Sequence, residues 1–491
     1  MIVPISAAKQ TKCALFGYNR LTMTQLSQET LRTLGPRVAV PGYDRASVTP
    51  GIVHIGVGGF HRAHEAVYTD DLLAQGTAQK WGICGVGLRP EDRTMRDALV
   101  PQNCLYTVMT RSADGDELRV IGSLVRYLFA PDEEQAVRDV LASPQTRIVS
   151  LTITEGGYGL EGAVQPGSVF AWLADALRQR RSTGIPAFTA LSCDNLPHNG
   201  DAAKHALLAA AADPDLARWI EENVAFPSSM VDRITPQTTD ADRALVQTEF
   251  GVDDAWPVVC EPFKQWIIED KFSNGRPPWE QAGAQFVPDV APYETMKLSL
   301  LNGSHFAMAY LGFLAGFTTV PALMADPGFR FFIQRLMDDE VSPLLPAVPG
   351  IDLSDYKATL LHRFDNPAIK DQITRLCLNG SPKFPQYLFP SLHKAVGSGR
   401  SHRLLTLALA GWLRYLSGKD EQGLPYLVDD PQAAALTALA RQAGTDPRPL
   451  LARTDLFGDL GQNSTFVGLL EEDLTYLYAE GARAALAAAL A

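Results

Sequence analysis

The sequence predicts a doubly wound α/β sheet domain followed by a predominantly α-helical domain. Up to about residue 289, short apolar runs rich in β-branched residues alternate with helical stretches, which is typical of a parallel sheet covered by helices. Beyond that point nearly every apolar run has helical spacing. A chain of 491 residues is also longer than one hydrophobic core usually supports. Two domains are therefore expected.

Buried strands of the first domain are indicated by continuous apolar runs, as expected for strands covered on both faces of a parallel sheet. These runs occupy residues 52–55, 81–88, 147–154 and 186–193. Helices are expected after the first and the last of them, over residues 63–74 and 202–212. Residues 101–130 have the pattern of an antiparallel hairpin, which we expect to be inserted in the same sheet.

The second domain is expected to consist mostly of helices. They are predicted over residues 296–317, 329–336, 355–362, 368–378, 401–416, 431–442 and 466–490. The predicted division is an N-terminal extension over 1–22, a nucleotide-binding domain over 23–289 and a helical substrate and catalytic domain over 290–491. Met23 opens the first segment of globular composition, so the residues before it are either an extension or the result of a misassigned start.

Composition and charge exclude several classes of function. The formal net charge of −12 gives no electrostatic driving force for non-specific nucleic-acid binding. No apolar run is long enough to span a membrane, and lysines and an arginine interrupt the N-terminal segment where a signal peptide would need an apolar core. The six cysteines form no CxxC pair, which argues against a disulfide framework. A reducing, cytoplasmic setting is expected.

A glycine-rich loop between the first strand and the first helix is the candidate cofactor site. Glycine permits the tight turn and the close backbone approach that a pyrophosphate at a helix N-terminus requires. The spacing lacks the third glycine of the usual dinucleotide fingerprint, because residue 61 is histidine, so a plain strand–turn–helix remains an alternative. The candidate residues are Gly56, Gly58, Gly59, Phe60, His61 and Arg62, the last as a source of positive charge.

Two carboxylates, Glu91 and Asp92, follow the second predicted strand. An acidic residue at this place accepts hydrogen bonds from the adenosine ribose in Rossmann-like folds. Two negative charges there would repel a 2′-phosphate, which favours NAD over NADP as the cofactor. Arg89 and Arg93 flank the pair, so an ordinary charged surface turn is the alternative.

His61 and His64, with Glu65 adjacent, have a spacing that could hold a metal ion at the start of a helix. Catalytic metal sites need three protein ligands and closed structural sites need four. The sequence offers no obvious third ligand, and these residues coincide with the candidate phosphate loop. No metal is predicted.

The strongest chemical signal is a group of polar residues inside the apolar helical run over 290–306. A buried helix has no stability reason to hold Lys297, Asn302 and His305, because each polar group must find a partner or lose a few kcal/mol on desolvation. On an α-helix, Asn302 and His305 lie about one turn apart on one face, with Lys297 roughly 12 Å along the axis from His305. This pattern suggests a proton-transfer site. The alternative is that Lys297 extends to solvent while the other two side chains bond to the backbone.

Taken together, the glycine loop and this helix resemble those of the polyol-specific long-chain dehydrogenases. The similarity extends from about Pro50 to the C-terminus, and the matching segments occur in one order. They are IVHIGVGGFHRAH, WGICGVGLRPEDR, RIVSLTITEGGYG, SCDNLPHNG, MVDRITP, VVCEPFKQW, EDKFSNGRP, MKLSLLNGSH and NGSPKFPQ.

The resemblance implies a zinc-independent, NAD-dependent oxidoreductase that interconverts a secondary alcohol and a ketone on a free sugar alcohol. Position by position, it implies that Lys297 is the general base and that Asn302 and His305 hold the substrate. Asn195 then resembles the second amide of an oxyanion site, and Glu294 resembles an acid that moves protons near the lysine. The family positions that bind polyol hydroxyls are matched by Asp232, Arg375 and Lys383, and those associated with coenzyme choice by Glu91 and Asp92.

These implied roles are chemically coherent. A lysine can accept the hydroxyl proton only if its pKa falls from ~10.4 toward neutrality, which burial in a water-poor cleft would cause. Amide hydrogens from Asn195 and Asn302 can stabilise the developing alkoxide, where one donor is typically worth about 3 kcal/mol.

For the substrate, the resemblance implies D-mannitol with D-fructose as its ketone, and a D-arabinitol dehydrogenase sharing the same site is an alternative. The C-terminal third also resembles fructuronate reductase, which acts on a sugar acid, but Arg375 and the GVGLRPED segment favour a polyol. An NAD-binding sensor without chemistry is the non-enzymatic alternative, and the proton-accepting lysine argues against it. The expected partner is a small molecule. No oligomer is implied, since the family includes monomers.

Overall fold

A five-stranded parallel sheet is the central element of the first domain in the computed structural model, which describes residues 23–491. The predicted extension over residues 1–22 lies outside the described residues. The spatial order of the strands is β7-β4-β3-β8-β9, and every neighbouring pair is parallel. This is a doubly wound order whose direction reverses between β3 and β8. The strands are β3 (Pro50–Ile55), β4 (Gly82–Gly87), β7 (Leu124–Phe129), β8 (Ile148–Leu151) and β9 (Thr189–Ser192).

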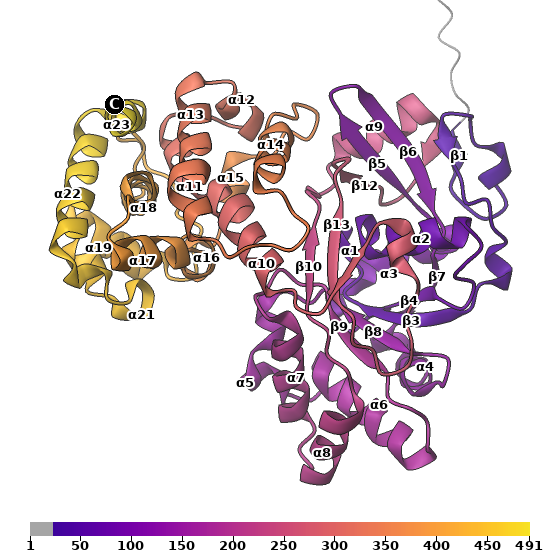
Figure 1. The fold of residues 1–491 in the computed structure, drawn as a ribbon. Helices are drawn as coiled ribbons and strands as arrows, with labels where there is room; N and C mark the ends of the chain where they lie inside the picture. Colours follow the sequence, from indigo (N-terminus) through magenta and orange to yellow (C-terminus); the bar gives the residue numbers. More distant parts are fainter. Residues whose placement is uncertain (1–22) are drawn as a thin grey trace, which may run out of the picture.

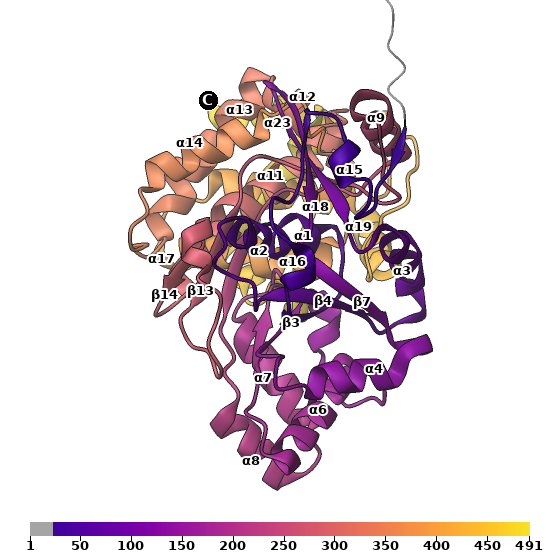
Figure 2. The same cartoon turned by 90° about the vertical axis from the view of Figure 1, so that its right-hand side faces the viewer.

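Both faces of this sheet are buried, because alternate residues of each strand point to opposite sides. In β3, Ile52 packs into the core beneath helices α1 and α2, whereas Val53 and Ile55 pack into the core on the other face. Figure 2 shows helices α4, α6 and α7 on that second face and α1 and α2 on the first. The predicted doubly wound sheet is therefore confirmed.

The predicted hairpin over residues 101–130 is only partly right. Strands β5 (Tyr106–Ser112) and β6 (Gly115–Ile121) do form an antiparallel pair. They belong to a separate four-stranded sheet, however, and β7 joins the edge of the parallel sheet beside β4. The periodicity of a short apolar run does not reveal which sheet a strand joins, since that depends on contacts far along the chain.

The remaining strands of the described chain form three smaller sheets. The four-stranded sheet has the order β12-β5-β6-β2, a three-stranded sheet has the order β10-β13-β14, and β1 pairs with β11. Their remaining members are β1 (Thr24–Gln25), β2 (Val38–Ala39), β10 (Ser229–Asp232), β11 (Val252–Asp253), β12 (Val258–Cys260), β13 (Gln265–Glu269) and β14 (Gln285–Val287).

Helices in the sheet domain cover and connect these strands. Several have caps readable in the sequence: the Ser168 hydroxyl accepts from the Ala171 N–H at the start of α6, and Gly184 ends that helix in the left-handed conformation. The helices are α1 (Gly59–Ala63), α2 (Glu65–Ala74), α3 (Arg93–Leu99), α4 (Ala130–Ala142), α5 (Leu160–Ala163), α6 (Val169–Thr183), α7 (Asn199–Ala210), α8 (Pro214–Asn223) and α9 (Asp240–Phe250).

From Ala291 onward the described chain is helical, as predicted. The core of this part is built around α11 and α18, whose side chains are almost all buried. The helices are α10 (Ala291–Lys297), α11 (Gly303–Leu314), α12 (Val320–Met324), α13 (Pro327–Arg335), α14 (Leu353–Phe364), α15 (Ile373–Leu376), α16 (Gly380–Tyr387), α17 (Phe389–Ser398), α18 (Arg403–Tyr415), α19 (Ala433–Ala443), α20 (Arg448–Leu451), α21 (Thr454–Phe457), α22 (Ser464–Ala479) and α23 (Gly481–Leu490).

Two predicted helices differ in extent for local backbone reasons. The helix expected over 368–378 is reduced to α15, because Lys370 adopts a left-handed conformation with φ of 50°. The helix expected over 466–490 is two helices, α22 and α23, with Gly481 at a φ of 82° between them. A left-handed residue cannot continue a right-handed helix.

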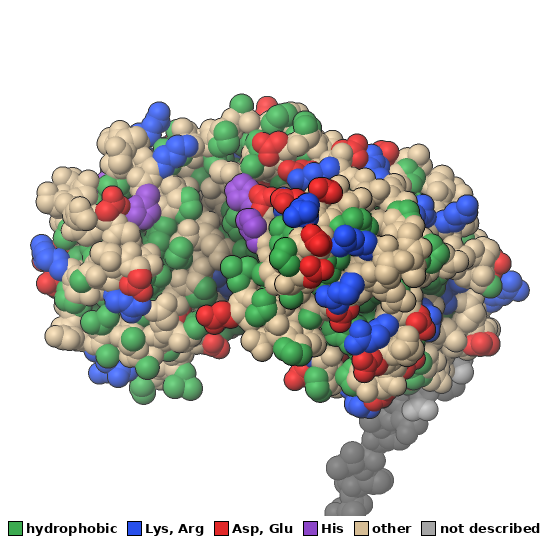
Figure 3. Space-filling view, turned by 90° about the horizontal axis from the view of Figure 1, so that it is seen from below, with side chains coloured by type: hydrophobic (Ala, Val, Ile, Leu, Met, Phe, Trp, Pro, Cys, Tyr) green, Lys and Arg blue, Asp and Glu red, His purple; other side chains and the backbone are tan. Residues whose placement is uncertain are grey.

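The two parts of the chain lie side by side, with the helical array on the left and the sheets on the right in Figure 1. Seen from below, the surface is hollowed between the two lobes, and positive and negative side chains intermingle on it (Figure 3). Strand β14 ends at Val287 and α10 begins at Ala291. The predicted boundary at residues 289 and 290, as a division into separately folding domains, stays a prediction. None of the helices over residues 23–491 is both long and apolar enough to cross a membrane.

Candidate active site

A cavity of about 460 Å³ lies at the carboxyl ends of β3, β8 and β9 and is bordered on its other side by residues of the helical array. Ligands bind to doubly wound sheets at this edge, where the strand order reverses. The lining residues are Gly56, Gly58, Gly59, Phe60, His61, Thr152, Thr154, Glu155, Cys193, Asp194, Asn195, Val231, Asp232, Arg233, Ile234, Thr235, Lys297, Leu301, Asn302, His305 and Arg375. The glycine loop and the Lys297 helix, far apart in sequence, therefore face one space.

The glycines of the loop serve different purposes. Gly56 has a φ of 95°, and a Cβ there would lie 2.1 Å from the carbonyl oxygen of Thr152, so only glycine fits. At Gly58 and Gly59, in contrast, the atom nearest to an added Cβ is 3.8 Å away. The packing of the protein does not require glycine at these two positions. They leave an open face toward the cavity, which suits the close approach of a ligand to the backbone.

Lys297 is buried at the end of α10, with a side chain held in the cavity rather than extended to solvent. Its Nζ donates a hydrogen bond to Oδ1 of Asn195, which follows β9. Burial lowers the pKa of Lys297 to about 8, although the nearby carboxylate of Asp232 acts in the opposite direction. A lysine in this state can lose and regain a proton near neutral pH.

Asn302 and His305 line the same cavity as Lys297, but the helix that connects them is not a regular α-helix. Residues Leu298–Asn302 form a π-helical turn between α10 and α11. Such turns are frequent at functional sites, because they rotate the following side chains relative to those before. The regular α-helical spacing expected between Lys297 and His305 is therefore interrupted at Leu298–Asn302.

Both side chains keep polar atoms free for a ligand. Asn302 Oδ1 and His305 Nε2 are buried and have no hydrogen-bond partner among residues 23–491. Burial lowers the pKa of His305 to about 4, so its ring is neutral at physiological pH. Because buried polar atoms are normally paired, these two leave hydrogen-bonding capacity for a polar ligand in the cavity.

Asp232 is held by a residue that the sequence analysis missed. Arg363, near the end of α14, donates to both carboxylate oxygens of Asp232 at 2.8 Å and also to both oxygens of Glu261. All three side chains are at most 3% exposed. In the sequence, Arg363 is an ordinary basic residue in the last turn of a helix, and no local signal indicated its partners 131 and 102 residues away.

The two other predicted hydroxyl-binding residues differ in position. Arg375 lines the cavity, and its Nε donates to Asp371 Oδ1 at 2.7 Å. Lys383 is not among the lining residues; its Nζ donates to the carbonyl of Leu378 at 3.1 Å, and burial lowers its pKa.

Glu294 lies one helical turn before Lys297, and the two line a small adjoining cavity with Asn195. One carboxylate oxygen accepts from the His198 N–H at 3.2 Å, and the other has no partner in the described part of the chain. Burial raises the pKa of Glu294 to about 7. This acid can therefore exist in both protonation states near neutral pH.

Only some of the predicted cofactor residues line the cavity. Phe60 and His61 line the cavity, whereas Arg62 points into the interior, where its Nη1 donates to the Trp256 carbonyl at 2.5 Å. Its Nε also donates to the Gly58 carbonyl at 3.3 Å, so the guanidinium does contact the glycine loop, and its role toward a pyrophosphate stays a prediction. Arg233, from the segment after β10, lines the cavity, and its guanidinium donates to the carbonyls of Ala63 and Glu261. Its signal in the sequence was only its place in the matching segment MVDRITP.

Glu91 and Asp92 lie on the turn after β4, outside the cavity lining. Glu91 is exposed, and Asp92 Oδ2 accepts from the Arg89 N–H at 2.9 Å, which stabilises the turn. The turn follows the strand next to β3, so its position remains that of a ribose-binding acid in this fold.

A possible third metal ligand, which the sequence analysis did not find, comes from β3. His54, His61 and Glu65 are buried, and their ligand atoms lie within 4.8 Å of one another. His64 points elsewhere, with Nε2 at 2.9 Å from the Gln265 carbonyl oxygen. Glu65 Oε2 already accepts from the Ser150 hydroxyl at 2.8 Å and lies 3.2 Å from His61 Nδ1. These bonds account for the cluster as a hydrogen-bonded support beneath the glycine loop.

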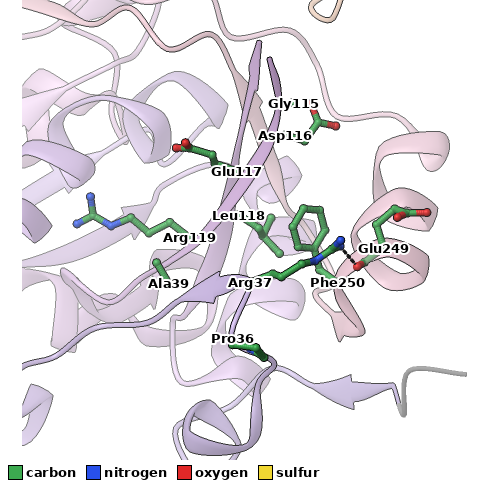
Figure 4. Close-up of a pocket in the computed structure, with 10 residues that line it drawn as sticks. All are labelled: Pro36, Arg37, Ala39, Gly115, Asp116, Glu117, Leu118, Arg119, Glu249 and Phe250. Atoms are coloured by element: carbon green, nitrogen blue, oxygen red, sulfur yellow. Dashed lines mark hydrogen bonds between the residues drawn. The ribbon is translucent and has the colours of Figure 1, made fainter. Parts of the chain in front are cut away.

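A larger cavity, of about 780 Å³, lies elsewhere, beside the tip of the β5–β6 hairpin (Figure 4). There the Arg37 side chain reaches across to the Glu249 carbonyl and lies over the ring of Phe250. Its polar side chains come from the residue before β2, from β6 and from the end of α9, and it shares no lining residue with the cavity around Lys297. Size alone therefore does not mark the candidate site.

A dinucleotide-type sheet joined at its carboxyl edge to a buried lysine defines a dehydrogenase-like architecture. The sequence profile of the mannitol dehydrogenase Rossmann domain matches residues 50–281, and that of the mannitol dehydrogenase C-terminal domain matches residues 289–478. The chain belongs to the mannitol dehydrogenase family, a family of oxidoreductases acting on CH–OH groups.

Individual relatives are similar over nearly the whole chain. A mannitol 2-dehydrogenase of Phaeosphaeria nodorum is 48% identical over 474 residues, which cover 92% of this chain and 83% of the relative. The solved structure of Pseudomonas fluorescens mannitol 2-dehydrogenase, a ternary complex with NAD and D-mannitol, has a TM-score of 0.88 at 47% identity and covers 95% of this chain and 99% of its own. A D-sorbitol dehydrogenase in substrate-free form has a TM-score of 0.85 at 36% identity, covering 94% and 100%.

Proposed function

We propose that this protein is an NAD-dependent mannitol 2-dehydrogenase that interconverts D-mannitol and D-fructose. The observation that carries the proposal is a buried lysine amine with a lowered pKa, in a cavity that joins a glycine loop to unpaired polar side chains. The similarity to mannitol 2-dehydrogenases over most of the chain supports the choice of substrate.

The residues present fit a dinucleotide. Gly58 and Gly59 leave the backbone open to the cavity, and Arg233 adds a positive charge that suits a pyrophosphate. Phe60 and His61 would border it, and Glu91 and Asp92 would meet the adenosine ribose. When bound, NAD accepts the hydride that leaves the carbinol carbon.

We propose that Lys297 accepts the hydroxyl proton as hydride departs, in its neutral form. Asn195 and Asn302 line the same cavity as Lys297, and the Asn195 amide is bonded to the lysine. Their N–H groups would stabilise negative charge on the oxygen before the proton is fully transferred. Glu294, with its pKa of about 7, would then take the proton onward from the lysine.

The other hydroxyl groups of the substrate would meet Asp232, His305 and Arg375. Asp232 keeps acceptor capacity beyond its bonds to Arg363, because a carboxylate has about four lone-pair positions. Lys383 would complete this group only after moving from the Leu378 carbonyl. One carboxylate acceptor together with the donors of Arg375 and Lys383 suits a chain of hydroxyls rather than an apolar substrate.

The oxidation rate is expected to rise with pH. Lys297 must be neutral to accept a proton, and its pKa is about 8, so kcat/KM for polyol oxidation should rise through about pH 8 and level off above it. Reduction of the ketose needs the protonated lysine and should fall over the same range. Initial rates in both directions from about pH 6 to about pH 10 test this. Equal pH dependence in the two directions would contradict the role of Lys297.

The substrate assignment is tested by following NADH absorbance with mannitol, arabinitol, sorbitol and fructuronate (the last with NADH). We expect mannitol to give the highest kcat/KM, and NAD to exceed NADP by at least roughly tenfold, because the carboxylates of Glu91 and Asp92 repel a 2′-phosphate. Turnover of fructuronate alone would move the function to the sugar-acid reductases. Preference for arabinitol would identify the protein as an arabinitol dehydrogenase. Equal use of NADP would contradict the proposed contact of Glu91 and Asp92 with the adenosine ribose.

We propose a cytoplasmic enzyme that binds a small-molecule polyol or ketose and needs no nucleic-acid or membrane partner. The cysteines of residues 23–491 are buried and unbridged, which suits a reducing compartment. An NAD-binding sensor is less consistent with the site, since a sensor has no need of a proton acceptor.

A further inference from the structure

We propose that Tyr387 is a positioning residue that holds Asn195 against the catalytic lysine. This inference rests on the proposed role of Lys297 as the base. Tyr387 is the last residue of α16, in the helical array, and it lies outside the cavity lining. Its hydroxyl oxygen accepts a hydrogen bond from Asn195 Nδ2 at 3.0 Å.

Asn195 is therefore bonded at both ends of its amide by the helical array. Oδ1 accepts from Lys297 Nζ, and Nδ2 donates to Tyr387. The asparagine itself follows β9 in the sheet domain, on a loop that lies across the cavity. A loop side chain on its own would sample several rotamers. The two bonds restrict its orientation, and Asn195 remains part of the cavity lining.

The tyrosine is rigid enough for this function. It is 4% exposed, and its ring packs edge-on against Phe306, with ring centroids 5.4 Å apart. Phe306 is the neighbour of His305 on α11, so the ring is anchored to the same helix that presents the substrate-binding side chains. Nothing about Tyr387 in the sequence separates it from the other aromatic residues of the helical core.

The chemical consequence concerns the proton on Lys297. A carbonyl oxygen facing the amine stabilises the ammonium form, which opposes the effect of burial on the lysine. If the amide of Asn195 loses its anchor, this acceptor is less well placed. The lysine should then become a weaker base, and the amide hydrogen meant for the alkoxide should lose its alignment.

The test is Tyr387→Phe, which removes the hydroxyl and keeps the ring. We expect kcat for mannitol oxidation to fall about tenfold, as the loss of one positioning hydrogen bond implies. The acid limb of the pH–rate profile should move to lower pH, and the dissociation constant of NAD should change less than about twofold, since Tyr387 does not line the cavity. Tyr310→Phe is the matched control: its buried hydroxyl bonds to the Cys377 carbonyl at 3.2 Å, outside the site, and both kcat and the profile should be unchanged.

A double-mutant cycle distinguishes positioning from a general structural effect. Asn195→Ala should move the acid limb in the same direction, and adding Tyr387→Phe to it should lower kcat by no more than about twofold. A full tenfold loss in the Asn195→Ala background, or an unshifted profile in Tyr387→Phe, would overturn the inference. A wild-type protein without activity on mannitol would instead contradict the proposed function. Failure of the Tyr387 inference and failure of the proposed function therefore give different results.

Discussion

Replacing Lys297 with alanine should lower kcat for polyol oxidation by about 10³-fold, within the range typical for loss of a general base. The variant should still bind NAD with a dissociation constant within about twofold of the wild type, because the glycine loop and Arg233 are untouched. The loss of kcat without a loss of NAD binding is expected because Lys297 and the glycine loop lie on different sides of the cavity. Lys297 Nζ bonds to Asn195 at the helical side of the cavity, whereas Gly58 and Gly59 form its sheet side.

Two further variants make this result specific. Lys264→Met removes another partly buried lysine whose pKa is lowered by burial, but Lys264 pairs with Asp71 outside the cavity, so activity should stay within about twofold. Lys297→Arg keeps the positive charge but should remain inactive, because a guanidinium does not give up its proton in proteins. Steady-state rates and NAD titration by protein fluorescence measure both quantities. Unchanged turnover in Lys297→Ala would remove the lysine from the mechanism.

Replacing Arg363 with methionine should destabilise the protein by about 3–5 kcal/mol, the usual effect of removing one partner from a buried ion-pair network. Asp232 and Glu261 would remain as two buried carboxylates without their shared cation. Arg363 belongs to the helical array and its partners to the sheet domain, so the loss should also weaken the join between the two parts. Urea unfolding of the two proteins compares their stabilities.

The stability deficit of Arg363→Met should depend on pH, because Arg363 is paired with carboxylates that can be protonated. The Arg363 guanidinium holds the pKa of Asp232 below its usual value. The carboxylates should be more easily protonated in Arg363→Met, so its deficit should shrink as pH falls. Arg335→Met breaks an exposed pair with Asp339 and should cost less than about 1 kcal/mol. Adding Asp232→Asn and Glu261→Gln should recover stability but not activity. A deficit in Arg363→Met no larger than that of Arg335→Met would contradict the interpretation.

Structural features that depend only on residues close together in the sequence could be predicted from the sequence. The four buried strands, the glycine loop after β3 and the helical second half follow from periodicity and turn chemistry, which are local. Lys297, Asn302 and His305 were recognisable because an amine, an amide and an imidazole are costly in an apolar helix. The site residues implied by resemblance came from matching segments, and the cavity brings Asp232, Arg375 and Asn195 to the lysine.

Only the tertiary structure could decide which partners these residues have. The π-helical turn at Leu298–Asn302, the inward direction of Arg62 and the placement of β5 and β6 in a separate sheet each depend on packing against distant elements. The bonds of Arg363 to Asp232 and of Tyr387 to Asn195 join residues 131 and 192 positions apart. Sequence patterns report the local preferences of a segment, whereas a hydrogen bond between distant side chains exists only once the fold has placed both groups within about 3 Å.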